Sequence, residues 1–498
     1  MEKNQINELR IEDMLDDGRA FGRYEGCAVF VTGGVPGDTV KAKVTKAKKS
    51  SAEAKMLEVI KRSEGRIPAR CRFAGECGGC AFQELSYDAQ KELKRNQVIG
   101  KLTRLGGLTD PKVNDIIGAD SLEYYRNKAV FAVGPHGEVG FVKGKSHFVI
   151  DVDDCMLQTD AAMVCAEALR TFIRNNHVNC ITQMTVRTAF GTGEVMVVLE
   201  SEKKEIPGIE ELVDMLDAAV YSLSPSADEE PGMTFEYRDA EETSGDDTIQ
   251  PAILQSLESV AVIHKGKCRI AAGKPTILEE VIAEDGRTVQ FEISPQSFYQ
   301  VNPEQMIRLY DKAAEYADLK GGETVLDLYC GAGTIGIWLL DKLRNEHPEA
   351  FDATRVIGIE TVKPAILDAN RNSVINGLVN TRYFCGKAEE ELPGMMGLAK
   401  LYKWNEVNER VERKPEIKID KVDVAVLDPP RAGCDEALLN AVVQAEPSRI
   451  VYVSCDPGTL ARDIKHLTAN GYEFVECTPV DQFPWTTHIE VVAKIQRR

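Results

Sequence analysis

The chain lacks any long apolar stretch, and none of its hydrophobic runs approaches the roughly 18 residues of a membrane-spanning helix. Its first 25 residues are polar and acidic, unlike a secretion signal. Aromatic residues make up only 7% of the 498 residues, and acidic residues outnumber lysine and arginine, so the net charge is −19. We therefore expect a cytoplasmic protein with no membrane partner. The net charge taken alone argues against nucleic acid as a partner.

Positive charge is nevertheless concentrated in one part of the chain. Residues 41–72 hold 11 lysines and arginines against 3 acidic residues, whereas residues 228–247 hold 9 acidic residues and one arginine. The basic block suits either a nucleic-acid contact or an ordinary soluble surface. The acidic block belongs to a stretch poor in large apolar residues, 224–248, which predicts a solvated loop insert.

The thirteen cysteines are scattered and lack a secretion signal, so they do not predict a disulfide framework. Three of them, Cys71, Cys77 and Cys80, lie within ten residues, and a Gly-Gly pair between the last two allows a tight turn. A metal site needs a fourth ligand, and Cys155 is the candidate. Four thiolates hold either zinc or an iron–sulfur cluster, and spacing alone slightly favours zinc.

The length and the succession of patterns predict several domains. Short β-rich runs at 27–33, 38–48 and 54–63 predict a small barrel, a type of fold that commonly binds nucleic acid through one face. The predicted divisions are a small β-barrel (1–63), a cysteine-rich loop with a linking helix (64–120), a central α+β domain with the acidic insert 224–248 (121–292), and a C-terminal α/β domain (293–498).

The C-terminal domain alternates strands with helices, which predicts a Rossmann-like, mostly parallel sheet of the α/β class. Two final β-runs joined by a short turn predict a terminal antiparallel hairpin, and a polar run at 403–420 predicts a second surface insert. The predicted strands are 324–331, 355–360, 423–430 and 449–456, followed by the hairpin runs 473–483 and 488–498.

A glycine motif follows the first of these strands. Gly331, Gly333 and Gly336 form G-x-G-x-x-G between a strand and a helix, where glycines let the backbone approach a ligand. Glu360 ends the next strand and can hold ribose hydroxyls. This pattern fits NAD as well as S-adenosylmethionine. The terminal hairpin and the Asp-Pro-Pro sequence that begins at Asp428 favour the methyl donor.

Cys455 ends the strand 449–456, so we expect it on the same sheet edge as Asp428. A cysteine there can simply be a small buried hydrophobe. Beside a methyl donor the cysteine can act as a nucleophile on uracil, because carbon 5 of uracil is a poor nucleophile until a thiolate adds to carbon 6. A base must then remove the proton from carbon 5. Glu490 is the candidate, although an exposed strand glutamate has the same pattern. Cys434 is the rival nucleophile.

Taken together, these motifs resemble the RNA 5-methyluridine methyltransferases, in the branch with an N-terminal TRAM domain and a [4Fe-4S] cluster, such as the 23S ribosomal RNA enzymes. The resemblance covers nearly the whole chain, and the net charge and the inserts 227–248 and 403–420 depart from it. The segments that carry it are VFVTGGVPGDTVKAKV, C-x5-CGGC-x2-Q, YRNKAVF, SFYQVN, LDLYCGAGTIG, LDPPRAG and VYVSCDPGTLARD.

The resemblance implies a role for each matching residue. Cys455 would be the nucleophile and Glu490 the base. The cluster, in preference to zinc, would be ligated by Cys71, Cys77, Cys80 and Cys155. Contacts to S-adenosylmethionine would come from Gln300, Tyr329, Glu360 and Asp428, besides the backbone at Gly331 and Gly333.

The resemblance also implies an RNA partner, with ribosomal RNA favoured and transfer RNA possible, and we expect a monomer. The basic barrel would grip phosphates, and the target base would leave its stack to reach Cys455. Arg126 and Lys128 are further RNA contacts or else ordinary surface residues of a strand. Two other functions fit parts of the pattern: an NAD-linked iron–sulfur oxidoreductase and a non-catalytic RNA-binding protein.

Overall fold

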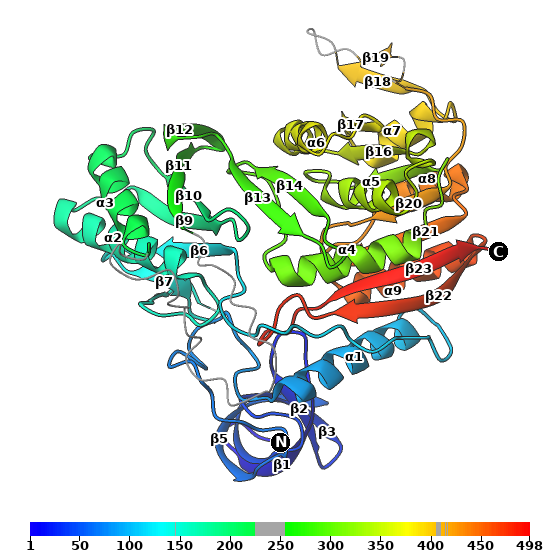
Figure 1. Ribbon diagram of the computed structural model, residues 1–498. Coiled ribbons are helices and arrows are strands. Elements are labelled where there is room, and N and C mark those ends of the chain that lie inside the picture. Colours follow the sequence, from blue (N-terminus) through cyan, green and yellow to red (C-terminus); the bar gives the residue numbers. More distant parts are fainter. Residues whose placement is uncertain (145, 225–253, 405–409, 414, 416) are drawn as a thin grey trace. The chain divides into compact units, whose positions relative to one another are not determined.

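The computed structural model describes residues 1–144, 146–224, 254–404, 410–413, 415 and 417–498 (Figure 1). Residues 225–248 of the predicted acidic insert lie outside them. The chain folds into two compact units, one formed by residues 1–122 and 304–498 and the other by residues 123–303. Among the described helices, none is both long and apolar enough to cross a bilayer.

The N-terminal strands close into a five-stranded barrel with the order β1-β2-β3-β5-β4, seen end-on in Figure 1. This confirms the predicted barrel. Sequence reasoning found only the last three strands, because β1 exposes Ile6 and buries Asn7, which interrupts the polar–apolar alternation expected of a strand. The strands are β1 (Ile6–Met14), β2 (Ala20–Tyr24), β3 (Cys27–Thr32), β4 (Thr39–Ala47) and β5 (Ser51–Lys61).

The C-terminal part of the same unit is a seven-stranded sheet with the order β17-β16-β15-β20-β21-β23-β22. All neighbouring strands are parallel except that β23 is antiparallel to both β21 and β22, which confirms the predicted terminal hairpin. The strands are β15 (Thr324–Leu328), β16 (Arg355–Glu360), β17 (Thr381–Cys385), β20 (Val424–Leu427), β21 (Arg449–Ser454), β22 (Tyr472–Val480) and β23 (Glu490–Arg497).

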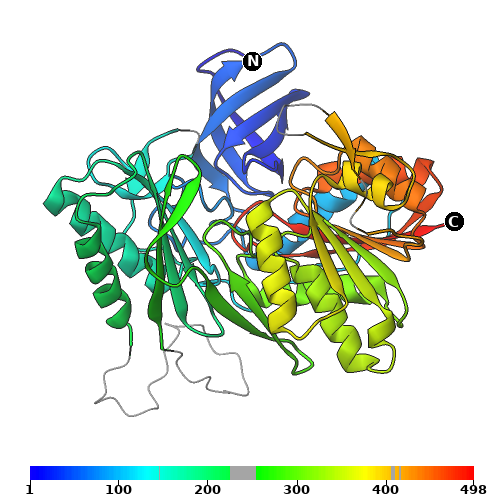
Figure 2. The same cartoon turned by 90° about the horizontal axis from the view of Figure 1, so that it is seen from above.

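Helices cover both faces of this sheet (Figure 2). Val98 and Leu102 of the predicted linking helix, α1, join residues of α7, α8 and α9 in the buried cluster on one face. The helices of this unit are α1 (Tyr87–Arg104), α4 (Pro303–Ala317, whose first residue belongs to the other unit), α5 (Thr334–Glu346), η1 (Phe351–Ala353), α6 (Lys363–Ile375), α7 (Ala388–Met395), α8 (Glu436–Ala445) and α9 (Pro457–Ala469).

Within the predicted polar insert 403–420, the described residues include parts of a two-stranded antiparallel sheet, β18 (Leu401–Trp404) with β19 (Arg410–Arg413). Its Cα pairing joins Leu401 with Arg413 and Trp404 with Arg410.

The second unit is an α+β fold. A sheet with the order β12-β11-β10-β9-β6-β7-β8 packs against two helices around a core that contains Leu169, Phe172 and Leu216. A separate pair, β13 with β14, follows. The elements are β6 (Lys128–Val133), β7 (Val139–Val142), β8 (Val149–Asp151), α2 (Asp160–Asn176), β9 (Ile181–Thr188), β10 (Glu194–Ser201), α3 (Ile209–Tyr221), β11 (Ser256–His264), β12 (Lys267–Gly273), β13 (Ile277–Ile282) and β14 (Thr288–Ile293).

Candidate active site

The strand order of the large sheet reverses between β15 and β20, and open α/β sheets place ligands beside such a switch point. After β15 the chain turns sharply, with Tyr329 at φ +63°, Gly331 at φ +52° and Gly333 at φ +76°. Gly333 is the N-cap of α5. A Cβ atom at Gly333 would lie 2.7 Å from the hydroxyl oxygen of Tyr383, so only glycine fits. The turn brings backbone N–H groups and a helix N-terminus to the carboxyl edge of the sheet.

Asp327, the penultimate residue of β15, is buried next to this turn. Its Oδ2 accepts a hydrogen bond from the Gly336 N–H at 3.0 Å, whereas its Oδ1 has no hydrogen-bond partner among the described residues. Burial, together with the charge of Glu360, raises the pKa of Asp327 to about 7. A buried acceptor without a donor is costly, so this oxygen suits a ligand that supplies one.

Two further carboxylates end neighbouring strands. Glu360 closes β16, and its two oxygens accept hydrogen bonds from the N–H groups of Gly331 at 3.4 Å and Val362 at 2.8 Å. Asp428 directly follows β20, and its N–H donates to the Leu328 carbonyl at 3.3 Å. Burial and the charge of Asp327 raise the pKa of Asp428 to about 7.

Five of the six predicted cofactor contacts therefore gather at the carboxyl ends of β15, β16 and β20. They are Tyr329, Gly331, Gly333, Glu360 and Asp428. The sixth, Gln300, is buried in the second unit, where its carbonyl accepts a hydrogen bond from the Asn127 side chain at 2.9 Å. Its contact with this site stays a prediction.

Cys455 directly follows β21 and lies half-buried at the same edge. Burial and the charges of Glu490 and Asp428 raise the pKa of this thiol to about 12, while the guanidinium of Arg431 acts in the opposite direction. Two carboxylates and one guanidinium therefore act electrostatically on the predicted nucleophile. At neutral pH this environment favours the thiol over the thiolate.

Glu490, the first residue of β23, is only 5% exposed, so the alternative of an exposed strand glutamate is wrong. Burial and the charge of Asp428 raise the pKa of Glu490 well above its usual range, and Arg431 opposes the shift. The hairpin places the predicted base next to the predicted nucleophile.

A cleft of about 130 Å³ opens in front of Cys455. Two ion or hydrogen-bond pairs lie on its walls: Lys101 contacts Asp16 at 2.6 Å, and an Arg431 guanidinium nitrogen lies 3.2 Å from His488 Nε2. The contributions of α1 and of the loop before β23 could not be predicted from local patterns, because these two segments lie hundreds of residues apart in the sequence. The residues that form the walls include Gln97, Lys101, Arg431, Cys455, Asp456 and His488.

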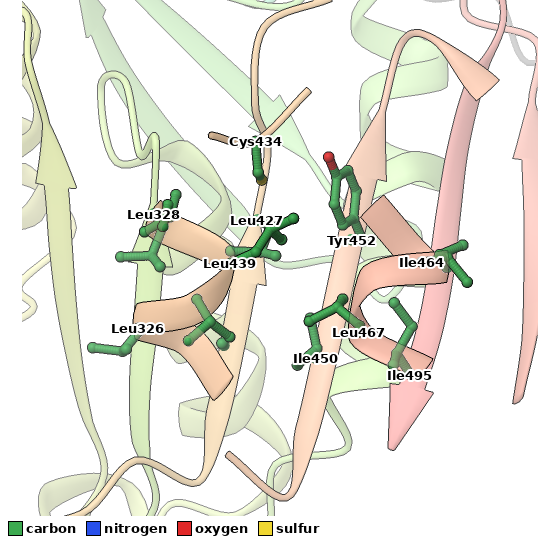
Figure 3. Packing of buried hydrophobic residues seen from close by; sticks show 14 of the residues in the cluster. Leu326, Leu328, Leu427, Cys434, Leu439, Ile450, Tyr452, Ile464, Leu467 and Ile495 are labelled. Atoms are coloured by element: carbon green, nitrogen blue, oxygen red, sulfur yellow. The ribbon is translucent and has the colours of Figure 1, made fainter. Parts of the chain in front are cut away.

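Cys434, the rival nucleophile, belongs to the hydrophobic interior. Its side chain lies in the buried cluster that contains Leu427 and Tyr452 (Figure 3). Its backbone N–H donates to Asp463 Oδ2 at 2.8 Å, and burial raises the pKa of its thiol to about 12. Cys455 lines an open cleft, whereas Cys434 is only 5% exposed and packs within the core.

The cysteine-rich loop brings some of its thiols near one another. The Gly79 N–H donates to the Cys77 sulfur at 3.4 Å, and burial raises the pKa of Cys77, with a contribution from nearby Cys71. Among the described residues, however, no three histidine, cysteine or acidic side chains are gathered closely enough to hold a metal ion. Cys155 belongs to the second unit. The ligand set stays a prediction.

The barrel carries cations over aromatic rings. Arg19 lies 5.3 Å from the ring centre of Phe30 and Arg23 5.5 Å from that of Phe21, and the two ring centres are 5.9 Å apart. Lys46 shares a small pocket with Arg19 and Phe30. Aromatic faces next to cations suit nucleic acid, because they combine base stacking with phosphate attraction.

A second cationic group lies on the sheet of the second unit. Lys128 on β6 is paired directly with Arg187 on β9, and like charges in such positions repel each other. Burial and the charges of Arg187 and Arg126 lower the pKa of Lys128 to about 8. Neither Lys128 nor Arg126 forms an ion pair within the part of the chain that the structure describes. The sequence did not identify Arg187 as part of this cationic group, because only the pairing of β6 with β9 places it next to Lys128.

The reversed strand order, the glycine turn and the antiparallel final strand define the class as a Rossmann-like methyltransferase. Comparison with known proteins specifies the family. A family described as tRNA (Uracil-5-)-methyltransferase matches residues 243–498, and the TRAM domain matches residues 2–57. The chain belongs to this uracil-5-methyltransferase family of RNA-modifying enzymes, so the NAD-linked oxidoreductase interpretation is wrong.

Similar proteins span essentially the whole chain. An "uncharacterized RNA methyltransferase" of Halalkalibacterium halodurans is 36% identical, with 99% of this chain and 97% of that protein covered. One of Clostridium acetobutylicum is 33% identical, with 100% and 98% covered. The structure of a tRNA (uracil-54, C5)-methyltransferase of Pyrococcus abyssi, in complex with S-adenosyl-L-homocysteine, has a TM-score of 0.68 at 24% identity, covering 98% of this chain and 100% of that one. That likeness supports the fold.

Proposed function

We propose that this enzyme transfers a methyl group from S-adenosylmethionine to carbon 5 of a uridine in structured RNA, through a covalent bond between Cys455 and carbon 6. The observation that carries the proposal is the position of Cys455. Its thiol lines an open cleft beside Glu490 and Asp428, whereas Cys434 is enclosed in the core.

The residues at the switch point suit the methyl donor. Glu360 is held at the end of β16 where it can accept hydrogen bonds from ribose hydroxyls, and Asp327 Oδ1 offers a buried acceptor that lacks a donor. Tyr329, Gly331, Gly333 and Asp428 would complete the pocket, with Gln300 from the second unit. When bound, S-adenosylmethionine supplies a methyl group on a sulfonium centre, which an electron-rich carbon can attack.

The protein's own groups would carry out the other steps. Cys455 would give up its thiol proton to solvent, and its thiolate would form a bond to carbon 6 of uracil. The electron pair of the double bond between carbons 5 and 6 would then form the bond from carbon 5 to the methyl group, while the bond between that methyl group and the sulfonium breaks and leaves its electrons on sulfur. The Glu490 carboxylate then accepts the proton from carbon 5. The electron pair of that C–H bond restores the double bond between carbons 5 and 6, and Cys455 leaves as a thiolate.

The site must also make a thiolate available. Arg431 is the cation that lowers the pKa of Cys455, against the effect of burial and of two carboxylates. Arg431, to which sequence reasoning gave no role, would hold the thiolate.

RNA would be held by several surfaces. The cation-aromatic group on the barrel, with Arg19 and Phe30, suits single-stranded bases, and the cationic group with Arg126 and Lys128 suits phosphate. We propose ribosomal RNA as the substrate, because the resemblance of the whole architecture points there. Transfer RNA is the second candidate, since the similar Pyrococcus abyssi structure is of a tRNA-modifying enzyme.

We also propose that Cys71, Cys77, Cys80 and Cys155 ligate a [4Fe-4S] cluster. The support is the resemblance and the Gly79 N–H that donates to the Cys77 sulfur, since hydrogen bonds to sulfur are usual around such clusters. Anaerobically purified protein should be brown and contain about four irons per chain. A colourless protein that carries zinc would contradict this assignment.

Release of tritium tests the reaction. RNA labelled with tritium at carbon 5 of uridine should release its label into water only when S-adenosylmethionine is present, because methylation replaces that hydrogen. Cys455→Ala should abolish release, and Cys434→Ala should retain it. Ribosomal and transfer RNA transcripts, assayed side by side, identify the substrate. Methyl incorporation without tritium release would contradict attack at carbon 5.

A further inference from the structure

A buried ion pair joins α1 to the loop that closes the terminal hairpin. Lys94 Nζ lies 2.6 Å from Asp481 Oδ1 and donates to the Phe483 carbonyl at 3.0 Å, and neither charged side chain is exposed. Burial lowers the pKa of Lys94, while Asp481 acts in the opposite direction. Such pairs contribute little net stability, because desolvation offsets the attraction. Stability alone is therefore a weak reason for this pair.

A second residue on α1 also forms a hydrogen bond with the loop. Gln90, one turn before Lys94, accepts a hydrogen bond at its Oε1 from the Trp485 N–H at 3.0 Å. Trp485 has a φ of +66°, and its indole N–H donates to the Leu122 carbonyl at 2.8 Å. Residues with side chains pay for this left-handed conformation, which persists only where the surroundings enforce it. Contacts to α1 thus determine the shape of the loop.

The held loop leads directly to the candidate active site. The Phe483 carbonyl that accepts from Lys94 also accepts from the Thr486 hydroxyl at 2.9 Å. The Thr486 hydroxyl oxygen accepts in turn from the His488 N–H at 3.2 Å, and the His488 ring contacts Arg431.

On the other side of the loop, Asp481 follows Val480, which is the cross-strand partner of Glu490. Asp481 of the ion pair is therefore adjacent to the residue that pairs with Glu490, the proposed base, across the hairpin. Figure 1 shows α1 running beside this hairpin, and both belong to one unit.

We infer that Lys94 and Asp481 are positioning residues that act through the hairpin loop to hold Glu490 against the substrate. This inference rests on the function proposed above and deepens it. Cys455 lies between β21 and α9 and is not on the loop, so its attack on carbon 6 should depend on the ion pair only weakly, through the contact between His488 and Arg431. Removal of the proton from carbon 5 should depend on it, because a displacement of about 1 Å in a catalytic group costs on the order of 100-fold.

The test uses the full-length protein and three variants. Lys94→Met leaves Asp481 as an unpaired buried charge. The double variant Lys94→Met with Asp481→Leu replaces both charges with apolar groups of similar size, which is often neutral or stabilising. Lys91→Met is the matched control, since Lys91 lies on the same helix but pairs with Asp88 at 2.8 Å.

Four quantities are measured for each variant: thermal stability, turnover, the fraction of protein covalently attached to ordinary uridine RNA, and the rate of adduct formation with 5-fluorouridine RNA. We expect Lys94→Met to lower stability and the double variant to restore it. Both should turn over about 100-fold more slowly and accumulate the covalent methylated complex, whereas formation of the 5-fluorouridine adduct should slow far less than turnover. Lys91→Met should match the wild type throughout.

A double variant with wild-type turnover would overturn the inference, because the pair would then serve stability alone. Equal losses in adduct formation and in turnover would also overturn it. Absence of any adduct in the wild type would instead refute the proposed function itself, so the two failures can be told apart.

Discussion

The Asp327→Asn variant should be more stable than the wild type at high pH and less stable than the wild type at low pH. Burial and the charge of Glu360 raise the pKa of this carboxyl from 3.8 to about 7. One pKa unit corresponds to about 1.4 kcal/mol, so above pH 7 the buried charge costs the folded state about 4 kcal/mol. Asparagine removes that charge but leaves an unpaired amide, at a cost of about 1–3 kcal/mol.

The sign follows from proton binding. A carboxyl with a raised pKa binds its proton more tightly in the folded state than in the unfolded state. The wild type therefore loses stability as the pH rises from about 4 to about 7, and Asp327→Asn does not. Near pH 8 the variant should be more stable by roughly 2 kcal/mol, and near pH 4 it should be less stable by about 1–3 kcal/mol.

Urea unfolding of both proteins at several pH values measures this crossover, and Asp463→Asn is the matched control. Asp463 is just as buried, but it accepts hydrogen bonds from Arg462 at 2.7 Å, from the Tyr452 hydroxyl at 2.6 Å and from the Cys434 N–H at 2.8 Å. Its asparagine variant should be less stable at every pH. A difference between Asp327→Asn and the wild type that does not change with pH would refute the reasoning.

Three further outcomes are expected. Glu490→Gln should slow turnover by a factor of about 10² to 10⁴ and trap methylated RNA on the protein, visible as a shifted band on a denaturing gel; rapid release would exclude Glu490 as the base. Cys434→Ala should keep full activity and lose about 1 kcal/mol of unfolding free energy, since it only leaves a small cavity; an inactive but folded variant would contradict its assignment to the core. Lys128→Met should weaken RNA binding and reduce the slope of the logarithm of the RNA-binding constant against the logarithm of salt concentration by about 0.7–0.9. Lys128→Arg should keep the wild-type slope. An unchanged slope in Lys128→Met would refute the proposed phosphate contact.

Much of the methyltransferase sheet could be predicted because each strand is a short apolar run that ends in a recognisable polar motif. The positions of Glu360, Asp428 and Cys455 at one edge followed from that pattern, since the carboxyl ends of parallel strands meet at one edge. The terminal hairpin followed from two β-runs with a short turn.

Other features depend on packing that no local pattern encodes. Cys434 and Cys455 both follow a strand of the same sheet, yet only the tertiary structure encloses one and exposes the other to a cleft. The helix α1 was predicted, but not that Lys94 on it is buried against Asp481, hundreds of residues away. In the barrel, β1 was not predicted because it exposes an isoleucine, Ile6, and buries a polar residue, Asn7.

The most direct test of the central claim is the fate of Cys455 when the enzyme meets RNA that contains 5-fluorouridine. Fluorine cannot leave as a proton, so the reaction should stop with the protein bound covalently to methylated RNA. Proteolysis and mass spectrometry should find the modified uracil on the peptide that contains Cys455, only when S-adenosylmethionine is present. An adduct on any other residue, or an adduct that persists in Cys455→Ala, would contradict the account.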